Sequence, residues 1–149
     1  MDDYRNRPKG TFNQQAKAAE LYALTQYWKS DLEFYKKDLG FLSELIDNYF
    51  IWIAEKEHID MVRDIEIGLL EIRKQCVDLL EKVTKHRQRL GKWVTDENLE
   101  GSRLIRAEHE HLEDEIAGFV KAFRKQRKET FRITEYVVDI EKLSGYLKS

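Results

Sequence analysis

The sequence predicts an all-α fold: three long antiparallel helices in an up-down-up, left-handed bundle with coiled-coil-like packing. Apolar residues recur in alternating steps of three and four along most of the chain, which is the pattern of helices that pack on one another. The single proline, Pro8, lies near the N-terminus, so no proline interrupts the periodic segments. Charged residues make up 36% of the chain, as expected for helices with wide solvent-facing surfaces. A strict seven-residue repeat drifts around a straight helix, and this drift predicts the left-handed supercoil.

Each of three periodic segments is expected to form one helix. The segments cover about residues 13–54, 59–93 and 102–147. Residues 1–12 are polar and contain both a proline and a glycine. We therefore expect a flexible N-terminal tail, followed by a single helical-bundle domain over residues 13–149.

The sequence marks the two connections between these helices unequally. Gly91 and Gly101 flank the second connection, and Asp96 and Asn98 between them suit the start of a helix. The first connection contains neither glycine nor proline. It is placed near residue 56 because the apolar register breaks after Ile53. One continuous helix over residues 13–93 is therefore the alternative.

Opposite charges predict the register of the second and third helices. If the chain turns near residue 97, the end of the second helix lies level with the beginning of the third. The first of these segments has five bases and no acid, and the second has five acids and no lysine or arginine: Lys82, Lys85, Arg87, Arg89 and Lys92, then Glu108, Glu110, Glu113, Asp114 and Glu115. Such charged flanks select one pairing of helices among several, although each exposed pair contributes at most about 1 kcal/mol. Further along, the basic segment over residues 121–132 is expected to face acids of the other two helices: Asp64, Glu66 and Glu71 of the second, and Asp38, Glu44 and Asp47 of the first.

Two histidines fall on the apolar faces of the same hairpin. His86 and His109 lie at one level, near Thr25 of the first helix. The favoured interpretation is a polar layer in which the imidazoles hydrogen-bond to Thr25, a carboxylate or water and fix the register. The alternative is a metal site in which His86, His109 and Glu108 bind zinc or another transition metal.

Other reactive side chains fit known chemistry less well. Glu-x-x-His, a spacing found in carboxylate-bridged di-metal bundles, occurs at Glu55–His58 and at Glu108–His111. The antiparallel arrangement separates the two pairs by roughly 45 Å along the bundle, which is too far for one centre. His58 is expected to be exposed. Cys76, on the apolar face of the second helix, is expected to be buried and unreactive.

The first helix carries a second apolar stripe beside its core face. Five residues form this stripe: Tyr27, Phe34, Phe41, Leu45 and Trp52. Together with the core face they cover about half of the helix circumference, more than a helix that packs on one side needs. Either the stripe packs on the other helices, or it is an exposed patch that binds another protein or a second copy of the chain. In the second case the acids within the apolar arc, Glu20, Asp31 and Asp38, need basic partners such as Lys74 or residues of the second copy.

The composition argues against several classes of function. The net charge is −2, which gives no general attraction to nucleic acid or to a membrane, and the longest apolar run, residues 49–54, is far too short to span a bilayer. No signal peptide is visible and the single cysteine suits a reducing compartment, so a cytoplasmic location is expected. Because a glycine-rich phosphate loop, a nucleophile elbow and a Cys-x-x-Cys motif are all missing, no catalytic residue, cofactor or enzyme activity is predicted.

These observations favour a non-catalytic interaction or scaffold protein. We expect it to associate through the first helix, as a homodimer or with another protein. Because aromatic rings bury large areas, an affinity in the micromolar range is expected for self-association. The alternative function is a metal-binding helical bundle that uses the core-facing histidines.

Overall fold

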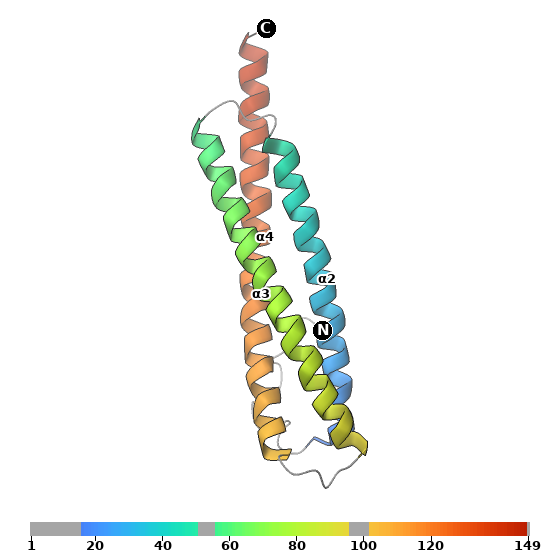
Figure 1. Cartoon of the computed structure of the whole chain (residues 1–149). Coiled ribbons are helices and arrows are strands. Elements are labelled where there is room, and N and C mark those ends of the chain that lie inside the picture. Colours follow the sequence, from blue (N-terminus) through green and yellow to red (C-terminus); the bar gives the residue numbers. More distant parts are fainter. Residues whose placement is uncertain (1–15, 51–55, 96–101, 149) are drawn as a thin grey trace.

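The computed structural model describes residues 16–50, 56–95 and 102–148 of the chain. In this part of the chain three helices form a bundle: α2 (Ala18–Phe50), α3 (Lys56–Thr95) and α4 (Ser102–Lys148) (Figure 1). Apart from Ala16 and Lys17, every described residue is helical, so the predicted all-α class is confirmed. Over the described residues, none of these helices is both long and apolar enough to cross a membrane.

The helix boundaries lie close to the predicted ones. α3 begins at Lys56, slightly before the expected start near residue 59, and α4 begins where expected, at Ser102. The continuous helix considered for residues 13–93 is wrong, because α2 ends at Phe50 and α3 returns alongside it (Figure 1). The predicted tail over residues 1–12 and the predicted ends of the first helix lie outside the described residues.

A side chain caps the beginning of α2. The backbone N–H of Lys17 donates to Oε1 of Glu20 (3.3 Å), and the N–H of Glu20 donates to the carbonyl of Lys17 (3.0 Å). A carboxylate three residues into a helix satisfies a backbone donor that has no partner within the helix. Its negative charge also interacts favourably with the helix dipole. Glu20, one of the acids in the apolar arc, therefore has a local structural role.

Contacts between α2 and α3 show that these helices run in opposite directions. The thiol of Cys76 donates to the carbonyl of Leu32 (Sγ to O, 3.3 Å). Further along α3, the guanidinium of Arg87 lies over the ring of Tyr22, 5.4 Å from its centroid. A later residue of α3 thus meets an earlier residue of α2, as an antiparallel pair requires.

Contacts between α3 and α4 show the same reversal. His86, in the second half of α3, meets His109 near the beginning of α4. His58, at the beginning of α3, packs edge-on against Tyr136 of α4 with 5.9 Å between ring centroids. α2 and α4 therefore run in the same direction, which makes the topology up-down-up. The left-handed supercoil stays a prediction.

The core extends along the bundle axis, with a smaller cluster at the end where α3 leads to α4. The larger cluster includes the fully buried side chains Trp28, Leu32, Leu39, Leu42, Ile46, Cys76, Val83, Ile116 and Phe119. The smaller cluster consists of Ala16, Ala18, Leu21, Leu90, Trp93 and Ile105. Arg106 closes this end, because its guanidinium lies over the Trp93 ring (4.8 Å to the centroid) and donates to the carbonyl of Ala16 (2.8 Å). Burial of each large apolar side chain contributes about 1.5–3 kcal/mol, and this burial holds the helices together.

One exposure prediction is wrong. His58 was expected to be exposed near an uncertain turn, but it is buried, with 4% of its surface accessible. The reason is that α3 begins before His58 rather than after it. The imidazole therefore lies in the first helical turn, where it contacts α4.

Candidate functional site

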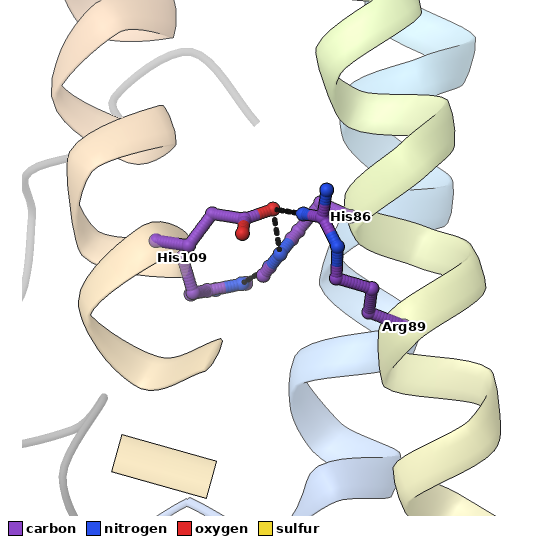
Figure 2. Close-up of polar contacts among 4 residues, drawn as sticks. His86, Arg89 and His109 are labelled. Carbon is purple, nitrogen blue, oxygen red and sulfur yellow. Dashed lines mark hydrogen bonds and ion pairs between the residues drawn. The ribbon is translucent and has the colours of Figure 1, made fainter. Parts of the chain in front are cut away.

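A chain of polar side chains crosses the interface between α3 and α4 within the core. Nδ1 of His86 lies 2.9 Å from Oε1 of Glu108, and Nε2 of His86 lies 3.0 Å from Nδ1 of His109 (Figure 2). Arg89, one turn after His86 on α3, donates to the same oxygen of Glu108. Both imidazoles are fully buried, whereas Glu108 and Arg89 are partly exposed. The chain therefore links an ion pair at the surface to two imidazoles in the core.

The acceptors in this chain determine where the protons lie. An ionised carboxylate only accepts hydrogen bonds, so Nδ1 of His86 carries the proton that is shared with Glu108. In a neutral imidazole the other nitrogen is then an acceptor, so Nε2 of His86 accepts from the Nδ1–H of His109. Both hydrogen bonds of the imidazoles, from His109 to His86 and from His86 to Glu108, thus point toward the carboxylate of Glu108. Arg89 balances the negative charge at that end.

Burial favours the neutral form of His86. Loss of hydration lowers the pKa of His86, and the positive charge of Arg89 lowers it further. The charge and the hydrogen bond of Glu108 act in the opposite direction but do not outweigh burial, so the pKa of His86 lies below its ordinary value. At neutral pH the imidazole is therefore uncharged, as the hydrogen-bond pattern requires.

Helix α2 contributes an aromatic ring to this site. Trp28 stacks on His109, with ring centroids 4.4 Å apart and an angle of 27° between the planes. Thr25 was one of the predicted partners of the histidines, but its buried hydroxyl donates to the carbonyl of Tyr22 in its own helix (2.7 Å). Of the predicted partners, the carboxylate is the one observed. The stacking of Trp28 on His109 was not predicted from the sequence, although the position of Trp28 one turn after Thr25 on the same face was a usable signal.

The three residues of the alternative metal site are brought together, but in the order of a hydrogen-bonded chain. Glu108 contacts the Nδ1 side of the His86 ring and His109 contacts the Nε2 side. The two ring nitrogens of one imidazole point in different directions, so Glu108 and His109 do not converge on a common point. Among the described residues, no group of three or more histidine, cysteine or carboxylate side chains is arranged to hold a metal ion. The metal-binding alternative stays a prediction for metal analysis.

The predicted charge complementarity between α3 and α4 is observed at two positions. Lys82 forms an ion pair with Glu115 (3.0 Å), and Arg89 forms one with Glu108. Glu115 also contacts Nε2 of His111 on its own helix (2.9 Å). Glu113 differs from the other acids, because it is buried rather than solvent-facing. The two blocks therefore align as predicted, but not every member is a surface charge.

At the other end of the bundle, the basic segment of α4 pairs with an acid of α2. Arg127 of the basic segment donates to Asp38 of α2 (Nε to Oδ2, 3.1 Å) and lies over the ring of Phe131 (4.9 Å to the centroid). Asp38 thus finds its base on α4 of the same chain, not on Lys74 of α3. Glu66 lies near the carboxyl of Asp47 instead. Burial and the repulsion of Asp47 together raise the pKa of Glu66.

The aromatic stripe of α2 is solvent-exposed. Tyr27, Phe34 and Phe41 expose 60%, 63% and 53% of their surfaces, so the stripe does not pack on the other two helices. Leu45 is half-buried. Trp52, the fifth residue of the predicted stripe, lies outside the described residues. The three rings recur every seven residues and therefore lie along one line of the helix, which we call the aromatic stripe from here on.

The only cysteine of the chain is in the core. Cys76 is fully buried, as predicted, and burial raises the pKa of its thiol to about 11, although the nearby charge of Lys36 acts in the opposite direction. A thiol with such a pKa is almost entirely protonated at neutral pH, and the thiolate is the reactive form. The unreactive character predicted for Cys76 therefore has a physical basis, which thiol labelling can test.

The described residues present two candidate sites of different kinds. The polar chain of Glu108, His86 and His109 is closed to solvent at its imidazole end. The aromatic stripe is open to solvent along α2. Comparison of the whole chain with protein-family models, with curated proteins and with solved structures finds no match in any of the three.

Proposed function

We propose that this protein is a non-catalytic helical scaffold that associates with a second copy of itself through the aromatic stripe. The observation that carries the proposal is the exposure of three large rings on one line of α2. Solitary exposed apolar residues are common on protein surfaces, but aligned aromatic rings are typical of interfaces. A solvated stripe of this kind has a free-energy cost that association removes.

The remaining clusters support a structural role. His86 and His109 contact each other, His86 also contacts Glu108, and Trp28 covers the ring of His109. Both nitrogens of His86 and Nδ1 of His109 form hydrogen bonds within the protein, and both rings are buried. A general acid or base must be within reach of its substrate, and fully buried imidazoles do not meet that requirement. The polar chain therefore fits a role in helix register better than a role in catalysis.

A second copy is the occupant that best matches the stripe. The rings are spaced by seven residues, so a two-fold axis at the central ring, Phe34, superposes the stripe on itself. Each ring exposes somewhat more than half of its surface, so three rings offer roughly 300 Å² per copy. Two copies thus bury roughly 600 Å² of aromatic surface before the polar rim is counted. This area suits a weak dimer rather than a permanent one, with a dissociation constant in the micromolar range.

Sedimentation velocity over a wide concentration range tests the proposal. The wild type is expected to convert from monomer to dimer at about ten micromolar or above. The Phe34→Asp, Phe41→Asp variant is expected to stay monomeric and to keep the helical circular dichroism of the wild type. The matched control is Ile67→Asp, Leu70→Asp, which places the same charges on exposed apolar residues of α3 and should still dimerise. Ile67 and Leu70 expose 56% and 69% of their surfaces.

A cysteine cross-link locates the interface. Because Phe34 lies at the centre of the stripe, a Phe34→Cys variant should form an intermolecular disulfide under mild oxidation, whereas Leu70→Cys should not. Native Cys76 is buried and does not compete. The proposal is wrong if the wild type sediments as a monomer at high concentration, or if the α3 variant abolishes the dimer as fully as the α2 variant does. A monomeric wild type would favour a different protein as the partner of the stripe.

A further inference from the structure

A groove of about 880 Å³ lies between α2 and α3, and its lining is rich in positive charge. Five cationic side chains line it: Lys29, Lys36 and Lys37 from α2, and Arg73 and Lys85 from α3. Gly40 lines the same groove, and beyond the neighbouring backbone of its own helix nothing lies within 4 Å of the place where a side chain would begin. Residues 29–40 of α2 alone span about 16 Å at the helical rise, so the groove is elongated along the bundle.

The two carboxylates of the groove neutralise only one of its ends. Glu33 lies 3.9 Å from Lys29, and Glu81 lies 3.1 Å from Lys85, each pair within one helix. The other three cations, Lys36, Lys37 and Arg73, form no ion pair with any described residue. Five cations against two carboxylates leave an excess of three positive charges in the groove, whereas the whole chain has a net charge of −2. Such concentrated like charges repel one another, and a bound anion relieves that repulsion.

The other side chains of the groove restrict the kind of anion. None of the described residues that line it is aromatic, so it offers no surface on which nucleotide bases stack. Leu80 is its one large aliphatic residue and is half-buried, so an amphipathic acidic helix finds no apolar anchor there. Lysine and arginine form their strongest hydrogen bonds with charged oxygens such as those of phosphate. The chemistry fits a compact, highly charged chain without bases.

We propose that this groove binds a short linear polyphosphate through Lys36, Lys37 and Arg73. The phosphates lie along the groove between α2 and α3, with the paired lysines, Lys29 and Lys85, toward its far end. The groove and the aromatic stripe use different residues of α2. Anion binding and the proposed self-association can therefore be tested with separate variants, and each can fail without the other.

Isothermal titration with sodium tripolyphosphate at low ionic strength tests the assignment. The wild type is expected to bind one equivalent with a dissociation constant of about 10–100 µM. The Lys36→Gln, Arg73→Gln variant should bind about tenfold more weakly or worse, because it removes two of the three unpaired cations. These side chains are exposed, so the thermal unfolding midpoint without ligand should stay close to that of the wild type.

A control variant removes the same net charge elsewhere. Lys125→Gln, Lys128→Gln changes two exposed lysines of α4 that do not line the groove, and its affinity should stay within about twofold of the wild type. The proposal is overturned by three results: no measurable binding to the wild type, equal weakening in both variants, or tighter binding of an oligoglutamate of equal charge. Equal weakening means attraction to the overall charge only. Tighter oligoglutamate binding makes an acidic protein segment the occupant instead.

Discussion

Nε2 of His86 and Nδ1 of His109 face each other across the α3–α4 interface, 3.0 Å apart and without solvent exposure. This contact holds only one proton between the two nitrogens. A proton added to Nε2 of His86 makes this imidazole a buried cation. While His109 keeps its proton on Nδ1, it also places two N–H groups opposite each other, so the contact becomes unfavourable. The register of α3 against α4 is thereby linked to the protonation of a core histidine.

We expect the stability of the fold to decrease in mild acid because of this pair. The pKa of His86 is lower in the folded protein than its ordinary value of 6.5, so the unfolded chain binds more protons below that pH. The contribution of His86 is complete above about pH 6.5 and is lost as the pH falls toward the lower folded pKa. The free energy of unfolding in urea at several pH values between about 5 and 7.5 measures this loss.

Two variants separate this effect from general acid destabilisation. His86→Leu, His109→Leu removes both imidazoles and should show a shallower dependence of stability on pH. His111→Leu changes an exposed histidine and should keep the wild-type dependence. At neutral pH the single variant His86→Leu should lose about 1–3 kcal/mol, because His109 and Glu108 each lose a hydrogen-bond partner. The histidine pair is not the origin of the pH dependence if stability changes equally steeply with pH in the wild type, in the double variant His86→Leu, His109→Leu, and in His111→Leu.

Metal analysis decides the alternative interpretation of the same residues. Because Glu108 and His109 lie on opposite sides of the His86 ring, we expect protein purified without chelator to contain less than about a tenth of an equivalent of zinc, iron or manganese. The melting temperature should be the same with and without EDTA. Near-stoichiometric metal that disappears in His86→Ala or His109→Ala would contradict the structural interpretation and support a metal-binding bundle.

The Lys82–Glu115 ion pair should set the pairing of α3 and α4 while adding little stability. Both side chains are partly exposed, so Lys82→Glu or Glu115→Lys alone is expected to cost from a few tenths to about 1 kcal/mol. The double exchange restores opposite charges and should recover most of that loss. Chemical denaturation of the four proteins gives the coupling energy directly. A double exchange that is no better than the two single changes combined would show that the pair is not coupled.

Reversing whole charge blocks is a less clear test, because Glu108 and the buried Glu113 do more than face a surface charge.

Replacing Glu66 by glutamine should stabilise the protein at neutral pH. The pKa of Glu66 is raised, mainly by burial and then by Asp47, so ionisation of Glu66 disfavours the folded state. Stability from protonated Glu66 is present at low pH and is lost as the pH rises through the folded pKa. Glu66→Gln should therefore gain a few tenths of a kcal/mol or more near pH 7, and the gain should vanish in acid. Glu71→Gln, an exposed acid of the same helix, is the control. A loss of stability in Glu66→Gln at pH 7 would disprove the repulsion.

The sequence alone determined the fold class and most of the register. Alternating steps of three and four place the same residues on one side of each helix, and burial of that side leaves few arrangements for three helices of similar length. Opposite charge blocks then predicted which ends of α3 and α4 meet, and the Lys82–Glu115 and His86–His109 contacts lie at that level. Periodicity and charge act along one helix, so they can be read from the chain itself.

Only the tertiary structure decided how individual side chains use that arrangement. The sequence left open whether Phe34 and Phe41 pack within the chain, because helical spacing gives a direction around one helix and not the positions of its neighbours. It predicted the wrong environment for His58, because the start of α3 has no glycine or proline signal. The stacking of Trp28 on His109 was missed for a related reason. Contacts between helices depend on how far each helix is rotated about its axis and how far apart the helices lie, and the packing of the whole core decides both.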